Sequence, residues 1–336
     1  MTESVDFRAV ASAIELDPAQ VPTIIGAADR SWRRLLQARD QLRTLDDDGS
    51  VAIFALGSLG RLEASAASDL DLAVIYRGSE TSAERASGRR AAAAALLREL
   101  DFAVADKTFA RALEVGALIG DIGGQMDTCG HLTYRALILT EGAYLHGPAA
   151  CRTIRETIFR AYTEGAIASG RFLSALGNDL HRYYRTICVD YRFKVEVAGK
   201  GWALRNLKLR HSRKVWHLAN LVLFCWASEL ADDAREGLLG SQLPRPPLVR
   251  IADGLAALDA APLAGALFLA YERFLAAIAA PETRAHLDAL AHESRYASTI
   301  YRGLRANADD LDTAAATIID HLLGRCHRYL IRFGLL

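Results

Sequence analysis

The sequence predicts an α+β protein in which a small mixed sheet precedes an all-helical part. Two short apolar runs, 51–56 and 69–76, have the composition of buried strands and flank a turn rich in glycine and other small residues. In the second half of the chain, apolar residues recur almost entirely at helical spacing. We therefore expect a helical lead-in at 1–48, a mixed domain at 49–150 and a helical domain at 151–336.

The lead-in is predicted to be helical up to the acidic stretch 46–49, which ends in glycine. Its apolar side chains recur at roughly helical spacing and should face a core. They are Ile24, Ile25, Trp32, Leu35, Leu36 and Leu42.

The mixed domain begins with the strands at 51–56 and 69–76. An alanine-rich stretch at 82–100, with Arg and Glu on its exposed face, predicts a helix, and 102–109 returns to strand composition. The order strand, turn, strand, helix, strand is that of a small mixed α/β domain.

The helical domain should contain several long helices. Glycines at 199 and 201 and the proline-rich stretch 244–247 are predicted to interrupt them. The expected helical segments are 153–198, 202–231, 249–279, 282–305 and 310–333.

Composition excludes several classes of protein. In 336 residues, 40 Lys and Arg balance 40 Asp and Glu, so no global charge favours nucleic acid or an anionic membrane. The five cysteines are far apart, which argues against a zinc site or a disulfide framework. We see no signal peptide and no stretch near the ~20 apolar residues of a membrane span. We expect a cytoplasmic protein with no membrane partner.

A glycine-containing turn follows the first strand. Gly57 and Gly60 allow a sharp turn and a close approach to a ligand, which leaves backbone N–H groups and the Ser58 hydroxyl free to hold phosphates. Arg61 can neutralise phosphate charge from the same turn. Ser68, which ends a run of five small residues, is assigned with them to nucleotide binding.

Two carboxylates follow at the start of the second strand. Residues two apart in a strand project to the same face, so Asp69 and Asp71 should point together while Leu70 and Leu72 enter the core. Mg²⁺ prefers one or two carboxylates together with phosphate oxygens. The spacing therefore predicts a site for Mg²⁺, or Mn²⁺ in its place, that could align an in-line displacement at phosphorus.

The whole stretch 57–72 resembles the DNA polymerase beta-like nucleotidyltransferase superfamily, whose signature is Gly-Ser followed about ten residues later by Asp-x-Asp. Its Gly-x-x-Gly-Arg-x-Glu and Ser-Asp-x-Asp-Leu elements are most similar to the N-terminal domain of bacterial protein-PII uridylyltransferases and related nucleotidyltransferases. The second element also occurs in cyclic-oligonucleotide synthases and aminoglycoside nucleotidyltransferases. The resemblance implies that the helical domain completes a nucleotide and acceptor cleft.

Many members of this superfamily use a third carboxylate on the next strand. Asp106 is the predicted third catalytic and metal-binding acid, because it lies among apolar neighbours where a lone charge would be costly. Asp127, in the glycine-rich stretch 120–130, competes for this role, and Asp101 could instead cap a turn.

A local excess of positive charge lies between residues 181 and 214. Pairs three residues apart share a helix face, so Arg182, Arg185, Arg205 and Lys208 are predicted to hold the nucleotide or a polyanionic acceptor. The alternative is a solvated face whose arginines pair with acids elsewhere. The ten cations are Arg182, Arg185, Arg192, Lys194, Lys200, Arg205, Lys208, Arg210, Arg213 and Lys214.

Together these observations predict a Mg²⁺-dependent nucleotidyltransferase that moves a nucleoside monophosphate from an NTP, ATP or UTP, to an acceptor, with release of pyrophosphate. The acceptor, which could be a protein, a small molecule or a nucleotide, is left open, and nucleic acid is not favoured. Two alternatives remain: a catalytically silent nucleotide sensor and a second-messenger oligonucleotide synthase.

Overall fold

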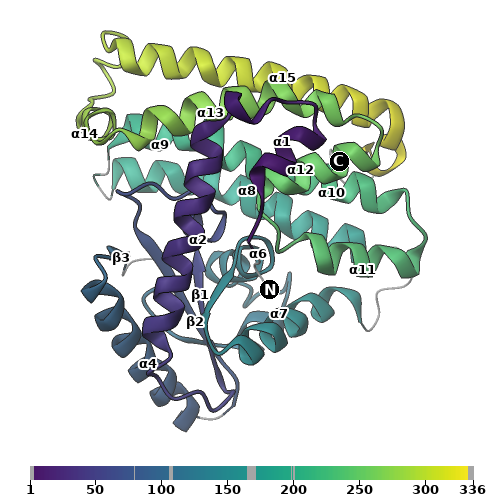
Figure 1. Ribbon diagram of the computed structural model, residues 1–336. Helices are drawn as coiled ribbons and strands as arrows, with labels where there is room; N and C mark the ends of the chain where they lie inside the picture. The colour runs from purple at the N-terminus through teal and green to yellow at the C-terminus, as the bar shows by residue number, and fades with distance from the viewer. Residues whose placement is uncertain are drawn as a thin grey trace.

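The computed structural model describes residues 4–78, 80–105, 109–164, 172–197, 199 and 201–331. It shows a sheet-containing part and a larger helical part that share one continuous core of buried apolar side chains (Figure 1). The predicted α+β class is confirmed.

Five strands form the sheet: β1 (Val51–Leu56), β2 (Leu70–Tyr76), β3 (Val104–Ala105), β4 (Leu113–Glu114) and β5 (Ala143–His146). The order is β3, β2, β1, β5, and β4 also pairs with β2. Strand β1 is antiparallel to both β2 and β5, whereas β3 and β4 run parallel to β2. All six residues of β1 are buried, as expected for a central strand covered on both faces.

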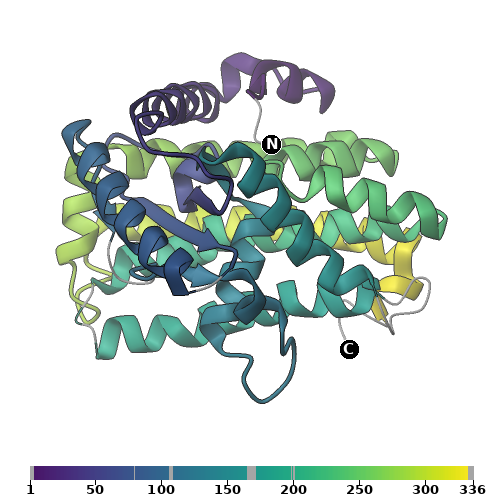
Figure 2. The same ribbon diagram turned by 90° about the horizontal axis from the view of Figure 1, so that it is seen from below.

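Helix α2 (Pro22–Leu42) connects the two parts of the molecule. In Figure 1 it runs from the helical part down to the sheet, and Figure 2 shows it with α1 (Phe7–Ala13) along one edge of the molecule. It contacts β5 and α4 (Glu80–Glu99) at one end and α13 (Ala264–Ala279) at the other. The predicted lead-in is therefore packed against both of the other predicted parts.

The N-terminus of α2 is capped by a residue distant in sequence. The backbone N–H groups of Thr23 and Ile24 donate to the two carboxylate oxygens of Glu272, each at 2.8 Å. An acid at this position satisfies otherwise unpaired N–H groups and matches the positive end of the helix dipole. This contact joins α2 to α13.

A buried cluster forms a second connection between the two parts of the molecule. In it, Arg135 donates hydrogen bonds to Asp127, Asp179 and the Tyr162 hydroxyl.

Helices complete the rest of the fold. The remaining elements are η1 (Pro18–Gln20), α3 (Gly57–Gly60), α5 (Val115–Ile119), α6 (Cys129–Thr140), α7 (Pro148–Thr163), α8 (Phe172–Glu196), α9 (Trp202–Lys208), η2 (Leu209–Arg213), α10 (Lys214–Ser228), α11 (Asp232–Gln242), α12 (Pro247–Ala257), η3 (Ala261–Leu263), α14 (Pro281–Ala289) and α15 (Thr299–Tyr329).

Several predicted boundaries were wrong. The segment 249–279 is two helices, α12 and α13, because the chain turns at Asp259, whose φ is 55°, and continues through a short 3₁₀ turn. The predicted break between 305 and 310 does not exist, since α15 continues through it with Leu304, Ala308 and Leu311 buried on one face. In the described part of 102–109, only Val104–Ala105 pairs as a strand.

One described segment, Ala261–Ala279, has the length and apolar composition of a membrane span. No membrane span was expected here, because Glu272 and Arg273 interrupt the run of apolar residues. In the fold Glu272 caps α2, and Arg273 binds Asn307 and Asp310. The side chains of Leu267, Phe268 and Phe274 are almost fully buried. The packing is that of a core helix of the helical part.

We expect Glu272→Ala to lower the free energy of unfolding by about 1–3 kcal/mol, because it leaves two N–H groups at the start of α2 without an acceptor. Chemical denaturation measures this loss. The matched control is Glu236→Ala, which removes an exposed acid from the middle of α11 and should change stability by less than ~0.5 kcal/mol. Equal effects of the two substitutions would show that the cap contributes nothing.

Candidate active site

The turn after β1 depends on glycine at its first position. Gly57 has a φ of +69°, and a Cβ there would lie 2.5 Å from Oδ2 of Asp71. Only glycine combines this backbone conformation with so close an approach to the carboxylate. The turn is thereby brought against the start of β2.

Gly60 allows a second close approach. A Cβ at this position would lie 2.0 Å from the carbonyl oxygen of Glu141 and 2.9 Å from that of Ala55. The four-residue helix α3 therefore packs directly on the backbone of the segment between α6 and β5.

A buried ion-pair network lies beneath the turn. Glu141 accepts from the Gly57 N–H at 2.9 Å and from Nη1 of Arg61 at 2.6 Å, and Nε of Arg61 donates to Glu63 at 2.9 Å. Burial disfavours the charge of Arg61, but Glu141 and Glu63 outweigh it and raise the pKa of Arg61 well above its usual value. The predicted phosphate ligand Arg61 thus already binds two carboxylates, which favours a structural role for its charge.

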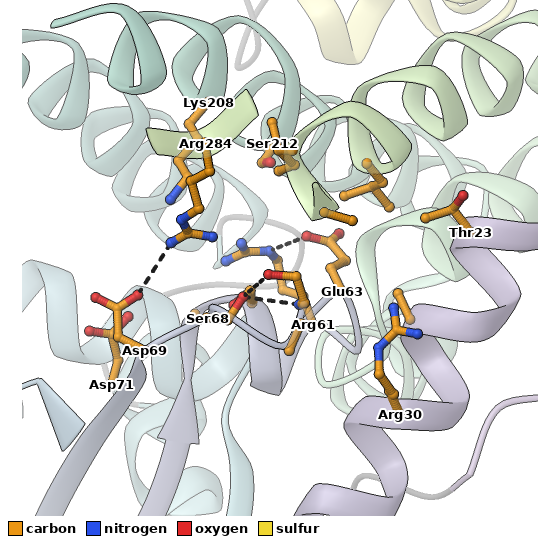
Figure 3. Close-up of a pocket in the computed structure, with 18 of the residues that line it drawn as sticks. Thr23, Arg30, Arg61, Glu63, Ser68, Asp69, Asp71, Lys208, Ser212 and Arg284 are labelled. Carbon is orange, nitrogen blue, oxygen red and sulfur yellow. Dashed lines mark hydrogen bonds and ion pairs between the residues drawn. The ribbon is translucent and has the colours of Figure 1, made fainter. Parts of the chain in front are cut away.

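The structure brings the two predicted metal ligands together. Asp71 lies on β2 opposite Leu56, and Asp69 lies just before the strand, with 65% of its side chain exposed. Burial, followed by the neighbouring Asp69 carboxylate, raises the pKa of Asp71. Figure 3 shows the two carboxylates side by side at one end of a cleft.

The cleft lies between the turn, β2, α2 and the helices of the second half of the chain, and has a cavity volume of about 110 Å³. Its lining residues are Thr23, Ala27, Arg30, Gly57, Ser58, Arg61, Glu63, Ala64, Ser65, Ser68, Asp69, Asp71, Lys208, Ser212, Arg213, Leu275, Ile278, Ala279 and Arg284.

Hydroxyl groups line the floor of the cleft near the carboxylates. Ser58 is half-buried in α3 and lines the cleft. Ser68 accepts from the Ser65 N–H at 3.0 Å, and the two hydroxyls lie 3.2 Å apart. These bonds fix the loop that leads to Asp69.

Three cations from the helical part face the carboxylates: Lys208, Arg213 and Arg284. Nη2 of Arg284 lies 4.0 Å from Oδ1 of Asp69, and Nη1 of Arg213 is buried without a hydrogen-bond partner among the described residues. Burial, and then the charge of Arg284, lower the pKa of Lys208 to about 8. Such a group of desolvated cations would be stabilised by an anionic ligand.

A π-helical turn, Leu209–Arg213, places one of these cations. Its i→i+5 pattern interrupts the α-helical register between Lys208 and Arg213, and both residues line the cleft. In a regular α-helix, at ~100° per residue, Arg213 would lie ~140° away around the axis. His211, stacked on Phe274 and bonded to Asn307, anchors the turn in the core.

The other predicted basic residues lie elsewhere. Arg182 pairs with Asp127 and Asp179, and Arg205 bonds the Gly201 carbonyl and lies 3.5 Å from Asp288. Arg185 is exposed on α8 and does not line the cleft. Of the four residues singled out in the basic segment, only Lys208 lines the cleft. The predicted role of the basic segment as a single nucleotide-binding surface therefore does not fit this arrangement.

The predicted third acid, Asp106, lies outside the described residues. Asp127 is held by Arg135 and Arg182, whose hydrogen bonds outweigh burial and keep its pKa well below the usual value. Asp101 occupies a turn with a φ of 58°. Neither of these two alternatives lines the cleft.

The donor set at the cleft fits a hard cation that shares its ligands with a nucleotide. No group of three or more His, Cys, Asp or Glu residues suited to a metal occurs in the described parts of the chain. Asp69 and Asp71 supply two carboxylates, and Mg²⁺ normally completes such a set with water and phosphate oxygens.

Sequence reasoning missed four residues of this site. Glu141 follows α6 without a motif, and Arg284 lies far along the chain from Lys208. Arg30 was hidden among the charges of an amphipathic helix. Arg213 was counted in the basic segment but was not among the residues selected from it.

The family described as "Putative nucleotidyltransferase DUF294" matches residues 13–110, which include α2, both carboxylates and the glycine turn. No curated protein is significantly similar to the chain. The match supports the predicted superfamily, whereas the closer likeness to protein-PII uridylyltransferases stays a prediction. The segment that carries the Gly-Ser turn and the Asp-x-Asp strand is thus a domain of the nucleotidyltransferase superfamily.

Proposed function

We propose that this protein is a Mg²⁺-dependent nucleotidyltransferase that transfers a nucleoside monophosphate from an NTP to an acceptor and releases pyrophosphate. One observation carries the proposal: a single cleft holds the Gly-Ser turn, the two adjacent carboxylates and three facing cations. The superfamily match supports nucleotidyl transfer in general. The metal, the acceptor and the residue roles are inferred from the cleft.

Each group has a role in this reaction. Asp69 and Asp71 would hold Mg²⁺, which when bound would offset the negative charge at the α-phosphate. Ser58 donates to a phosphate oxygen, and Lys208, Arg213 and Arg284 offset the charge of the leaving pyrophosphate. The acceptor oxygen forms a bond to the α-phosphorus. The bond from this phosphorus to the oxygen that bridges the α- and β-phosphates breaks, and pyrophosphate leaves.

Incubation with Mg²⁺, each α-labelled NTP and a cell extract as acceptor source tests the proposal. Label on protein, on a small molecule or on another nucleotide identifies the class of acceptor, and label on another nucleotide would favour an oligonucleotide synthase. Mg²⁺-dependent NTP binding without any transfer would instead indicate a sensor.

Asp69→Asn and Asp71→Asn should each lower kcat/KM by at least about a hundredfold, because each removes a charge that holds the metal at the reacting phosphate. Thermal melts should show that both variants stay folded. Asp101→Asn, a matched change at a turn outside the cleft, should leave turnover unaltered. Near wild-type turnover in both cleft variants would refute the metal assignment.

Ser58→Ala and Arg61→Ala should have different consequences. The first should weaken binding of every NTP by a similar factor, about tenfold, with little change in Tm. The second should destabilise the fold by about 3–5 kcal/mol, because it leaves Glu141 and Glu63 buried without their cation. Binding titrations and thermal melts of both variants separate the two effects. A stable Arg61 variant with weakened NTP binding would indicate that Arg61 contacts phosphate, as the sequence predicts.

NTP affinity should fall as pH rises through about 8. The pKa of Lys208 is lowered to about 8, so the ammonium that attracts phosphate is present below this pH and lost above it. Lys208→Arg keeps the charge and should remove the loss of affinity. Dissociation constants measured from pH 7 to 9 for both proteins give the comparison, and an unchanged alkaline loss in the variant would exclude Lys208 as its source.

A further inference from the structure

The cleft continues beyond the phosphate region into a slot between α2 and α13. Figure 3 shows Thr23 and Arg30 on α2 at the end of the cleft away from Asp69 and Asp71. The spacing of residues 23, 27 and 30 places them on one face of α2. The slot is lined by Thr23, Ala27 and Arg30 from one helix and by Leu275, Ile278 and Ala279 from the other.

Arg30 is the charged group of this slot. Its side chain folds back along α2 over Gly26, where an added Cβ would first meet Nη1 of Arg30 at 3.8 Å. Its Nε atom is buried, and no hydrogen bond to it is found within the described residues. The guanidinium therefore has at least one N–H for which no described residue is the acceptor.

The surroundings of Arg30 fit a flat ring better than a phosphate. The side chains that α13 contributes to the cleft lining, Leu275, Ile278 and Ala279, are aliphatic, and burying phosphate oxygens against aliphatic carbon would be costly. The cations Lys208, Arg213 and Arg284 already gather at the other end, beside the carboxylates. An apolar slot with one oriented polar group is typical of a site for an aromatic ligand.

We propose that this slot holds the base of the NTP and that Arg30 selects bases that present carbonyl oxygens. A guanidinium donates hydrogen bonds and accepts none. It pairs with O6 and N7 of guanine and with the carbonyls of uracil, whereas the amino group of adenine is a donor that Arg30 cannot satisfy. The chain is thus a GTP- or UTP-preferring enzyme, an inference that rests on the proposed nucleotidyltransferase function.

Equilibrium titration of the full-length protein with ATP, GTP, CTP and UTP, each with Mg²⁺, tests this inference without knowledge of the acceptor. GTP or UTP should bind at least about tenfold more tightly than ATP, the range expected for one bidentate pair. Arg30→Gln should reverse the ratio in favour of ATP, because glutamine both donates to and accepts from adenine. Arg33→Gln, an exposed change on the same helix, should leave the ratio unchanged.

Arg30→Lys separates charge from hydrogen-bond pattern. It keeps the positive charge but loses the planar fork, so preference for GTP or UTP should drop while overall NTP affinity holds. Tightest binding of ATP by the wild type, or equal weakening of all four NTPs by Arg30→Gln, would overturn the base assignment; both leave nucleotidyl transfer intact. Failure of the proposed function gives a different result: NTP binding that depends on neither Mg²⁺ nor Asp71, or Mg²⁺-dependent binding without transfer of label to any acceptor.

Discussion

The carboxylate of Glu141 is the contact on which the site depends. It accepts from the first N–H of the glycine turn and from Arg61, and so joins these two buried groups. Because the same turn lies against Asp71, the position of a predicted metal ligand is tied to an acid that does not line the cleft. A fully paired buried network of this kind fixes geometry even where its net contribution to stability is small.

Helix α2 extends this constraint across the molecule. One end receives the Glu272 cap from α13, and further along, the Ser31 hydroxyl accepts from the Ala64 N–H of the loop before the carboxylates. Both walls of the cleft are therefore attached to one rigid element. The same helix thus supports the carboxylate end of the cleft and the slot near Arg30, the two places to which the triphosphate and the base of an NTP are assigned in the proposal.

The sequence was sufficient where function is local. Gly57, Ser58, Asp69 and Asp71 lie within fifteen positions, and strand periodicity alone brings the two acids together. It was insufficient where residues converge from distant helices. Arg284 and Glu141 have no periodic relation to the motif, and the π turn that ends at Arg213 has no clear sequence pattern. The prediction for the basic segment was wrong for a physical reason. Arg182 pairs with Asp127 of a buried cluster, and proximity in sequence does not determine which face of the helices lies at the cleft.

The π-helical turn at Leu209–Arg213 also bears on how this protein could be engineered. Its hydrogen bonds are rarer and its turn wider than those of an α-helix, so a helix optimised for stability alone would not contain it. Natural proteins break such local rules mainly at functional positions. Thermostabilising designs that regularise every helix would therefore remove Arg213 or Lys208 from the cleft and exchange activity for heat resistance.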